Sequence, residues 1–101
     1  MVKRVYKIIW SDHAKQQLKD IHTFIKKDSQ QGANLVRNKI LESTKILSVG
    51  SIIYEADSLK DNNQGNYRAY TIYSYRITYK IEKDFILILR VRHTSREPLE
   101  Y

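Results

Sequence analysis

The stretch Tyr75 to Arg92, YRITYKIEKDFILILRVR, decides the fold because apolar and polar side chains alternate on both sides of a polar tripeptide. A period of two predicts two antiparallel strands joined by a tight turn, with one face buried. Pairing Ile81 with Phe85 gathers the apolar residues of both strands on that face, whereas a slip of one residue would carry an apolar row into solvent. This register predicts that Arg76 lies directly opposite Arg90.

Arginines are concentrated in this part of the chain: five of the seven lie between Tyr67 and Arg96. Like charges facing each other across a sheet cost roughly 0.2–1 kcal/mol. A chain that keeps them is expected to use them on an anion, since the planar guanidinium suits phosphate and carboxylate. The alternative is a solvated surface, or one paired with carboxylates of the same chain.

Composition narrows the class of protein. With 101 residues, the chain is expected to form a single domain over residues 1–101. The absence of cysteine excludes disulfides and thiolate zinc sites, and three scattered histidines predict neither a metal site nor a cofactor. No apolar run is long enough for a membrane span or a signal peptide, so a cytoplasmic location is expected. The net charge of +7 favours a polyanionic partner, either nucleic acid or an acidic protein.

Helix signals occupy the first half of the chain. Ser11 is a candidate N-cap for a helix reaching about Lys27, and Ser29 is a candidate cap for a second helix that ends near Ser48. So short a joint predicts an antiparallel helical hairpin. Strands are predicted from residue 2 to near residue 10, within 51–58, and over 67–72, 75–81 and 85–92, with a loop at 61–66. The expected fold is α+β, in the order β-α-α-β-β-β, with the hairpin packed on one face of an antiparallel sheet of about four strands.

Three segments carry a resemblance to a known family: WSDHAKQQLKDIHTFI at 10–25, NYRAYTIYSYRITYKI at 66–81 and ILILRVRHTSREPLEY at 86–101. Together they resemble the RelE/ParE superfamily of bacterial toxins from two-gene toxin–antitoxin systems. The resemblance implies a toxin that an acidic antitoxin neutralises in a hetero-oligomer. RelE-like members cut messenger RNA on the ribosome, whereas ParE-like members poison DNA gyrase by binding it and are not known as nucleases. Enzymatic activity is therefore expected only if the chain is RelE-like.

The resemblance also suggests site residues. Arg68 and Tyr70 occupy positions where RelE-like enzymes often keep functional lysines, Arg76 matches a central-strand arginine, and Arg96 a late arginine. In a RelE-like enzyme the catalytic residues would be Arg76, His93 and Arg96. The Tyr70 phenol or the His93 imidazole would then serve in proton transfer. The full set expected to bind the target protein or RNA is Arg68, Tyr70, Arg76, Arg90, Arg92 and Arg96.

One feature favours ParE-like over RelE-like activity. The helical hairpin, with its serine-containing break and an early small residue in the second helix, resembles the ParE-like pattern and favours gyrase poisoning. The turn at Ile72-Tyr73-Ser74 decides whether Arg68 and Tyr70 share the face of Arg76, because a three-residue turn puts them there and a two-residue turn does not. A third reading is a basic nucleic-acid-binding module without toxicity.

Overall fold

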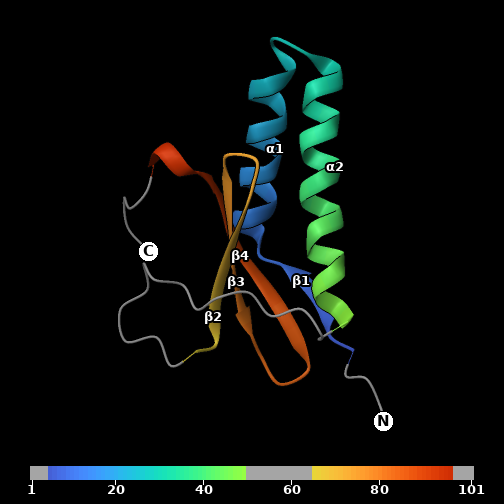
Figure 1. The fold of residues 1–101 in the computed structure, drawn as a ribbon, viewed down its shortest axis with the longest axis vertical. Helices are drawn as coiled ribbons and strands as arrows, with labels where there is room; N and C mark the ends of the chain where they lie inside the picture. Colours follow the sequence, from blue (N-terminus) through green and yellow to red (C-terminus); the bar gives the residue numbers. More distant parts are fainter. Residues whose placement is uncertain (1–4, 50–64, 97–101) are drawn as a thin grey trace.

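The computed structural model describes residues 5–49 and 65–96. Figure 1 shows a helical hairpin standing beside a sheet, in the predicted order β-α-α-β-β-β. The predicted strand within 51–58 lies outside the described residues, as does most of the predicted loop at 61–66. The elements are β1 (Lys7–Trp10), α1 (Asp12–Lys26), α2 (Gln30–Ile46), β2 (Tyr67–Ile72), β3 (Tyr75–Ile81) and β4 (Phe85–His93), with short 3-10 turns at Leu47–Val49 and Thr94–Arg96.

Both predicted helix caps are confirmed. The Ser11 hydroxyl accepts a hydrogen bond from the Ala14 N–H at 3.0 Å, and the Ser29 hydroxyl accepts one from the Gly32 N–H at 2.9 Å. Each cap satisfies a backbone donor that the first helical turn leaves open. The predicted antiparallel hairpin follows, because only the short break around Asp28 separates α1 from α2.

The sheet has the strand order β1-β4-β3-β2, and β1 runs parallel to β4. The prediction of a purely antiparallel sheet was therefore wrong for β1, although β2, β3 and β4 are antiparallel neighbours. The reason lies in the strand order. No tight turn joins β1 to β4: two helices and two strands lie between them along the chain, and a connection of this length permits parallel pairing.

The predicted register between β3 and β4 was also wrong. Ile81 lies opposite Ile86, and Arg76 lies opposite Arg92 instead of Arg90. The register shifts between Thr78 and Tyr79, which leaves one extra residue on β4, a β-bulge. Alternation could not reveal it, because every residue from 85 to 89 is apolar and either parity could face the core.

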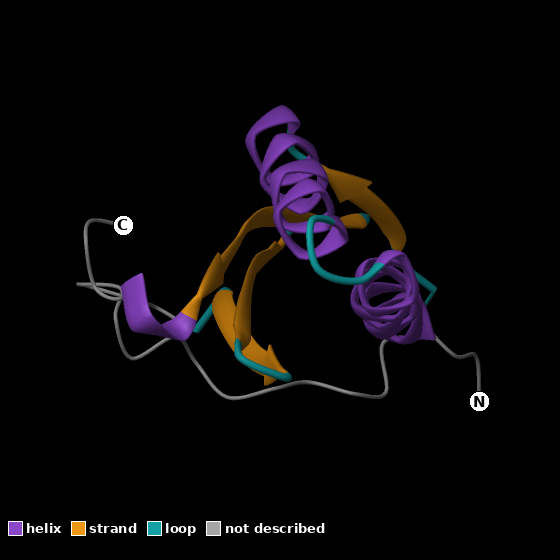
Figure 2. Cartoon of the chain, turned by 90° about the horizontal axis from the view of Figure 1, so that it is seen from above, coloured by secondary structure: helices purple, strands orange, loops and turns teal. Residues whose placement is uncertain are grey.

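The hydrophobic core lies between the sheet and the two helices. Figure 2 shows the curved sheet bordering both helices. Ile77 and Tyr79 of β3 are 0% and 1% exposed, and Tyr75 packs against the same cluster, as predicted. The remaining buried members are Ala14, Leu18, Ile40, Leu47, Tyr70, Ile86, Ile88 and Val91. The odd-numbered residues of β3 and the even-numbered residues of β2 thus point toward the helices.

Candidate functional site

Three arginines gather on the face of the sheet that points away from the helices. Arg76 of β3 lies directly opposite Arg92 of β4, and Arg90 lies opposite Thr78, two residues along from Arg76. Arg76, Arg90 and Arg92 are called the arginine cluster below. All three are partly buried, and Thr78 between them is only 3% exposed.

Part of each of two arginine side chains in the cluster is buried. The Nε atoms of Arg76 and Arg90 are covered from solvent and donate no hydrogen bond, although both residues take part in other interactions. The strand register places the three arginines at neighbouring positions on one face of the sheet. Guanidinium groups suit bidentate contacts to carboxylate or phosphate, so this face can bind a partner rich in either group.

Arg68 and Tyr70 do not join the cluster. Ile72 pairs with Tyr75, so the turn has two residues, and both side chains lie on the helix face of the sheet. Tyr70 is 7% exposed, and its hydroxyl lies 2.8 Å from the Ser43 hydroxyl of α2. The Arg68 Nε atom donates to the carbonyl of Gly65 at 2.7 Å. Tyr70 is thus a core residue in this fold, which removes it from an exposed binding set.

His93 also lies on the helix face, directly opposite Tyr75, while Arg76 lies on the other face. The two rings meet edge to face at 5.3 Å. The Ser95 N–H donates to the His93 Nδ1 atom at 3.1 Å, so the neutral imidazole carries its proton on Nε2. Arg96 ends the 3-10 turn that follows β4. The structure therefore separates His93 from Arg76 of the predicted catalytic set.

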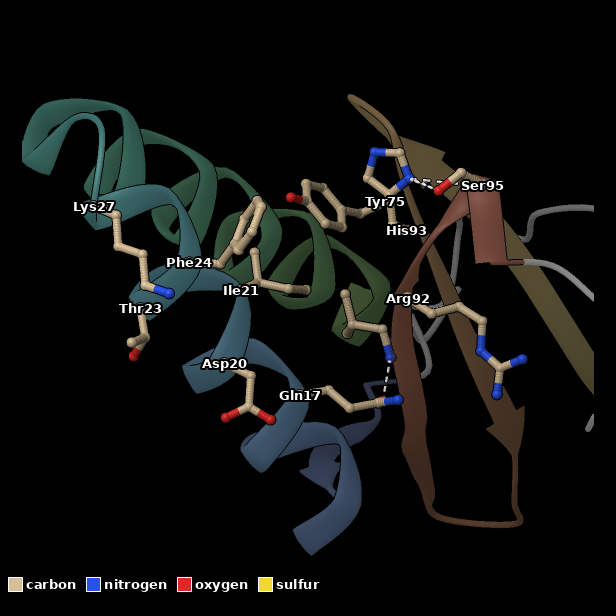
Figure 3. A pocket seen from close by; sticks show the side chains of 11 residues that line it. Gln17, Asp20, Ile21, Thr23, Phe24, Lys27, Tyr75, Arg92, His93 and Ser95 are labelled. Carbon is tan, nitrogen blue, oxygen red and sulfur yellow. Dashed lines mark hydrogen bonds between the residues drawn. The ribbon is translucent and has the colours of Figure 1, made fainter. Parts of the chain in front are cut away.

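A cleft of about 550 Å³ opens between α1 and the ends of β3 and β4, and the sequence reasoning missed it. Figure 3 shows Ile21 and Phe24 of α1 facing Tyr75 across it, while the side chain of Arg92 points away from α1. Its lining residues are Gln17, Asp20, Ile21, Thr23, Phe24, Lys27, Tyr75, Val91, Arg92, His93 and Ser95. The sequence contained one signal for this cleft, Phe24, which lies beside the apolar stripe of α1 and is not needed for the core. Its side chain is 66% exposed.

Other features of the described residues narrow the possible chemistry. Within residues 5–49 and 65–96, no group of three His, Cys, Asp or Glu side chains is placed to hold a metal ion. No helix in those same ranges is long and apolar enough to cross a membrane.

The Glu82 carboxylate lies 2.9 Å from the Lys80 ammonium and raises the pKa of Lys80 above its usual value.

Comparison with solved structures identifies the fold. The fold resembles the chromosomal ParDE toxin–antitoxin system from P. aeruginosa (TM-score 0.72, 18% identity, 88% of this chain and 96% of the other). It also resembles the RelBE2 toxin–antitoxin complex from Mycobacterium tuberculosis (TM-score 0.59, 17% identity, 89% of this chain and 92% of the other). A third similar structure is the YoeB dimer from Staphylococcus aureus (TM-score 0.51, 18% identity, 87% of this chain and 95% of the other). The chain therefore has the RelE/ParE toxin fold.

The family follows from sequence. Residues 8–98 match the family described as the ParE toxin of the type II toxin–antitoxin system parDE. The chain belongs to this family, and the expected RelE/ParE superfamily membership is confirmed. No curated protein sequence matches the chain.

Proposed function

We propose that this protein is a ParE-like toxin that stops growth by binding DNA gyrase through the arginine cluster. The observation that carries the proposal is the juxtaposition of Arg76 and Arg92 across β3 and β4, with Arg90 beside them, on the face that the helices leave uncovered. Arginines gathered on one face of a sheet are typical of a surface that binds carboxylate or phosphate. Gyrase and its DNA offer carboxylates and phosphates to such a surface, and the toxin would act in the cytoplasm.

Binding is favoured over RNA cleavage by the positions of the proton-transfer candidates. A general acid or base must lie within hydrogen-bond reach of the reacting group. The Tyr70 phenol is buried against Ser43, and His93 lies on the other side of the sheet from Arg76. Neither residue can therefore act together with the arginine cluster on one phosphodiester, which supports the ParE-like reading along with the family match.

The proposed neutralising partner is an acidic antitoxin that forms a hetero-oligomer with the toxin. The net charge of +7 attracts an acidic chain over long distances. Two of the structurally similar proteins are described as parts of toxin–antitoxin systems. A partly disordered antitoxin would fold as it wraps the basic surface, in the way that charged, disordered segments commonly bind.

Growth arrest after induction tests the role of the arginine cluster. Arg76→Glu should abolish arrest, because it reverses a charge at the centre of the cluster, and Arg76→Lys should retain part of it. Lys39→Glu on the exposed surface of α2 makes the same change in net charge away from the sheet and should leave arrest intact. Circular dichroism checks that each variant folds. Arrest by Arg76→Glu equal to that by the unaltered chain would remove the arginine cluster from the mechanism.

A paired assay with purified components identifies the target. The toxin should trap gyrase on cleaved DNA and leave messenger RNA whole in a translation mixture that contains ribosomes. Cleaved messenger RNA with unaffected gyrase would instead identify a RelE-like nuclease. Strong binding to naked RNA or DNA that weakens steeply with salt, with neither effect, would identify a nucleic-acid-binding module.

A further inference from the structure

A serine and a histidine at the end of β4 both line the cleft beside α1. The Ser95 hydroxyl lies 2.8 Å from the Nδ1 atom of His93, and Figure 3 marks this contact. Nδ1 accepts the Ser95 N–H and therefore carries no proton, so the hydroxyl is the donor in the shorter contact. A hydroxyl that donates to a neutral imidazole has the arrangement of a nucleophile and its general base.

Two contacts hold the His93 imidazole in this orientation. The Ser95 N–H donates to Nδ1 at 3.1 Å within the 3-10 turn that follows β4. The Tyr75 ring meets the imidazole edge to face, with ring centroids 5.3 Å apart and ring planes at 90°. A base that its neighbours orient in advance loses little freedom when it takes a proton. The distance of 2.8 Å between Oγ and Nδ1 also lies within the range of roughly 2.6–3.2 Å that proton transfer requires.

The cleft offers space and apolar surface to a molecule that reacts at Ser95. The Ser95 side chain is exposed, whereas the His93 side chain is partly buried. Ile21 and Phe24 of α1 face Tyr75 across the cleft, and Phe24 is 66% exposed. The cleft volume of about 550 Å³ is within the range of roughly 300–1,000 Å³ that small-molecule sites occupy. An apolar chain can therefore lie along these residues while its reactive end meets the Ser95 hydroxyl.

The charges on the α1 side of the cleft favour a neutral reactant. Asp20 and Lys27 both line this side, so neither an anion nor a cation is selected there. A carbonyl carbon is the electrophile that a serine hydroxyl with a neighbouring base attacks. Among neutral carbonyl compounds, a thioester combines an apolar acyl chain with a thiolate that leaves readily. The cleft therefore suits a thioester with an apolar chain.

We propose that Ser95 is an acylation site that takes an apolar acyl group from a thioester. The Ser95 Oγ atom attacks the carbonyl carbon while Nδ1 of His93 takes the hydroxyl proton. The carbon–sulfur bond then breaks, and the leaving thiolate takes that proton from Nδ1, so the products are a Ser95 ester and a free thiol. The acyl chain lies against Phe24 in the cleft. This reaction makes no use of the arginine cluster and is independent of the gyrase proposal.

Incubation of the full-length protein with S-hexanoyl-N-acetylcysteamine tests the proposal. The chain contains no cysteine, so any free thiol that appears comes from this thioester. Thiol release should approach one equivalent per protein molecule, and peptide mass mapping should find the hexanoyl group on Ser95. Ser95→Ala should abolish this modification. Thr94→Ala removes the hydroxyl of a neighbouring exposed residue in the same 3-10 turn and should leave the modification unchanged.

Two further variants separate the base from the cleft. His93→Phe keeps an aromatic ring beside Tyr75 but removes the base, so acylation should slow by about 100-fold, the lower end of what a general base supplies. Phe24→Ala should slow the hexanoyl thioester by about tenfold relative to the acetyl thioester, because the longer chain loses an apolar contact. Leu35→Ala should not change this ratio, because Leu35 is 53% exposed on α2 and does not line the cleft.

Each of three results would overturn the proposal. The first is hexanoyl groups on lysines with Ser95 unmodified, or no modification at all. The second is acylation of His93→Phe at the rate of the unaltered protein. The third is an equal effect of Phe24→Ala on the acetyl and hexanoyl thioesters. Circular dichroism checks that each variant is folded before its rate is compared.

Discussion

The hydrogen bond between Tyr70 and Ser43 connects the sheet to α2 and makes a sharp test of where Tyr70 acts. The Ser43 hydroxyl donates to the Ile40 carbonyl at 2.7 Å, so in the bond of 2.8 Å between the two side chains the Tyr70 hydroxyl is the donor. Ser43 is 8% exposed and Tyr70 is 7% exposed. Tyr70→Phe removes this bond, leaves the ring in place and creates no large cavity. The expected loss of stability is about 1 kcal/mol, the net value of one intramolecular hydrogen bond.

Urea unfolding followed by circular dichroism measures this loss. With a urea dependence of about 1–2 kcal/mol/M for a chain of this size, the unfolding midpoint should fall by roughly 0.5–1 M. The melting temperature should fall by about 4–8 °C. Ser43→Ala removes the acceptor and leaves a buried phenol without it, a cost of about 1–3 kcal/mol that alanine's better helix propensity offsets in part. The double variant should show a coupling free energy of at least about 0.5 kcal/mol.

Growth arrest decides what this bond means for function. A core residue whose loss costs about 1 kcal/mol leaves most molecules folded, so Tyr70→Phe should still arrest growth. The interpretation of Tyr70 as a core residue fails if the variant unfolds at the same urea concentration as the unaltered protein and yet no longer arrests growth. That outcome would mean that the phenol meets the target, as the family resemblance first suggested.

Three further predictions concern local structure. Ser11→Ala should lower the unfolding free energy by about 1–2 kcal/mol, and Ser29→Ala should lower it by less. The reason is that Ser29 caps only its own helix, whereas Ser11 also donates to the edge of the sheet. Equal losses of the two variants in urea unfolding would contradict this difference. Tyr73 has a φ of 54°, a left-handed conformation that strains any residue but glycine. Tyr73→Gly should therefore relieve about 1 kcal/mol of backbone strain and raise the melting temperature. A lower melting temperature would show that the Tyr73 ring stabilises the fold by more than this strain costs. The Glu82 carboxylate raises the pKa of Lys80, so the stability from this pair is fully present below pH 10.5 and lost as the pH rises through the raised value. Lys80→Met should therefore leave the pH dependence of unfolding unchanged around neutral pH, and a changed slope there would contradict the assignment.

The helices could be predicted from sequence because their signals are local. A cap such as Ser11 or Ser29 acts on N–H groups three residues away, and an apolar stripe along one helix specifies its buried face. The strand pairing depends on distant partners instead. Nothing near Trp10 indicates that β1 will lie beside β4, because this neighbour is set by packing between segments that are far apart in the sequence.

Only part of the candidate site could be predicted from the sequence. Arg90 and Arg92 are two residues apart on one strand, so alternation places them on the same face, as the structure does. Alternation left the positions of Arg68 and Tyr70 open, because these depend on the length of one turn, and the structure has the two-residue form. The cleft was invisible for a further reason: it requires α1 to extend past the end of β1, which is a property of three-dimensional packing.

The β-bulge at Leu89 decides which residues of β4 enter the core and which face outward with the arginine cluster. Ile86 and Ile88 face the helices, and in an unbroken ladder Arg90 and Arg92, which have the same parity, would face the helices too. Two guanidinium groups in that core would cost several kcal/mol each, comparable to the whole stability of a small domain. One extra residue at Leu89 reverses the parity, so that both arginines turn outward and Val91 enters the core at 1% exposure. The apolar run that obscures the register from sequence is therefore also the feature that permits the bulge, because either parity of residues 85–89 can face the core.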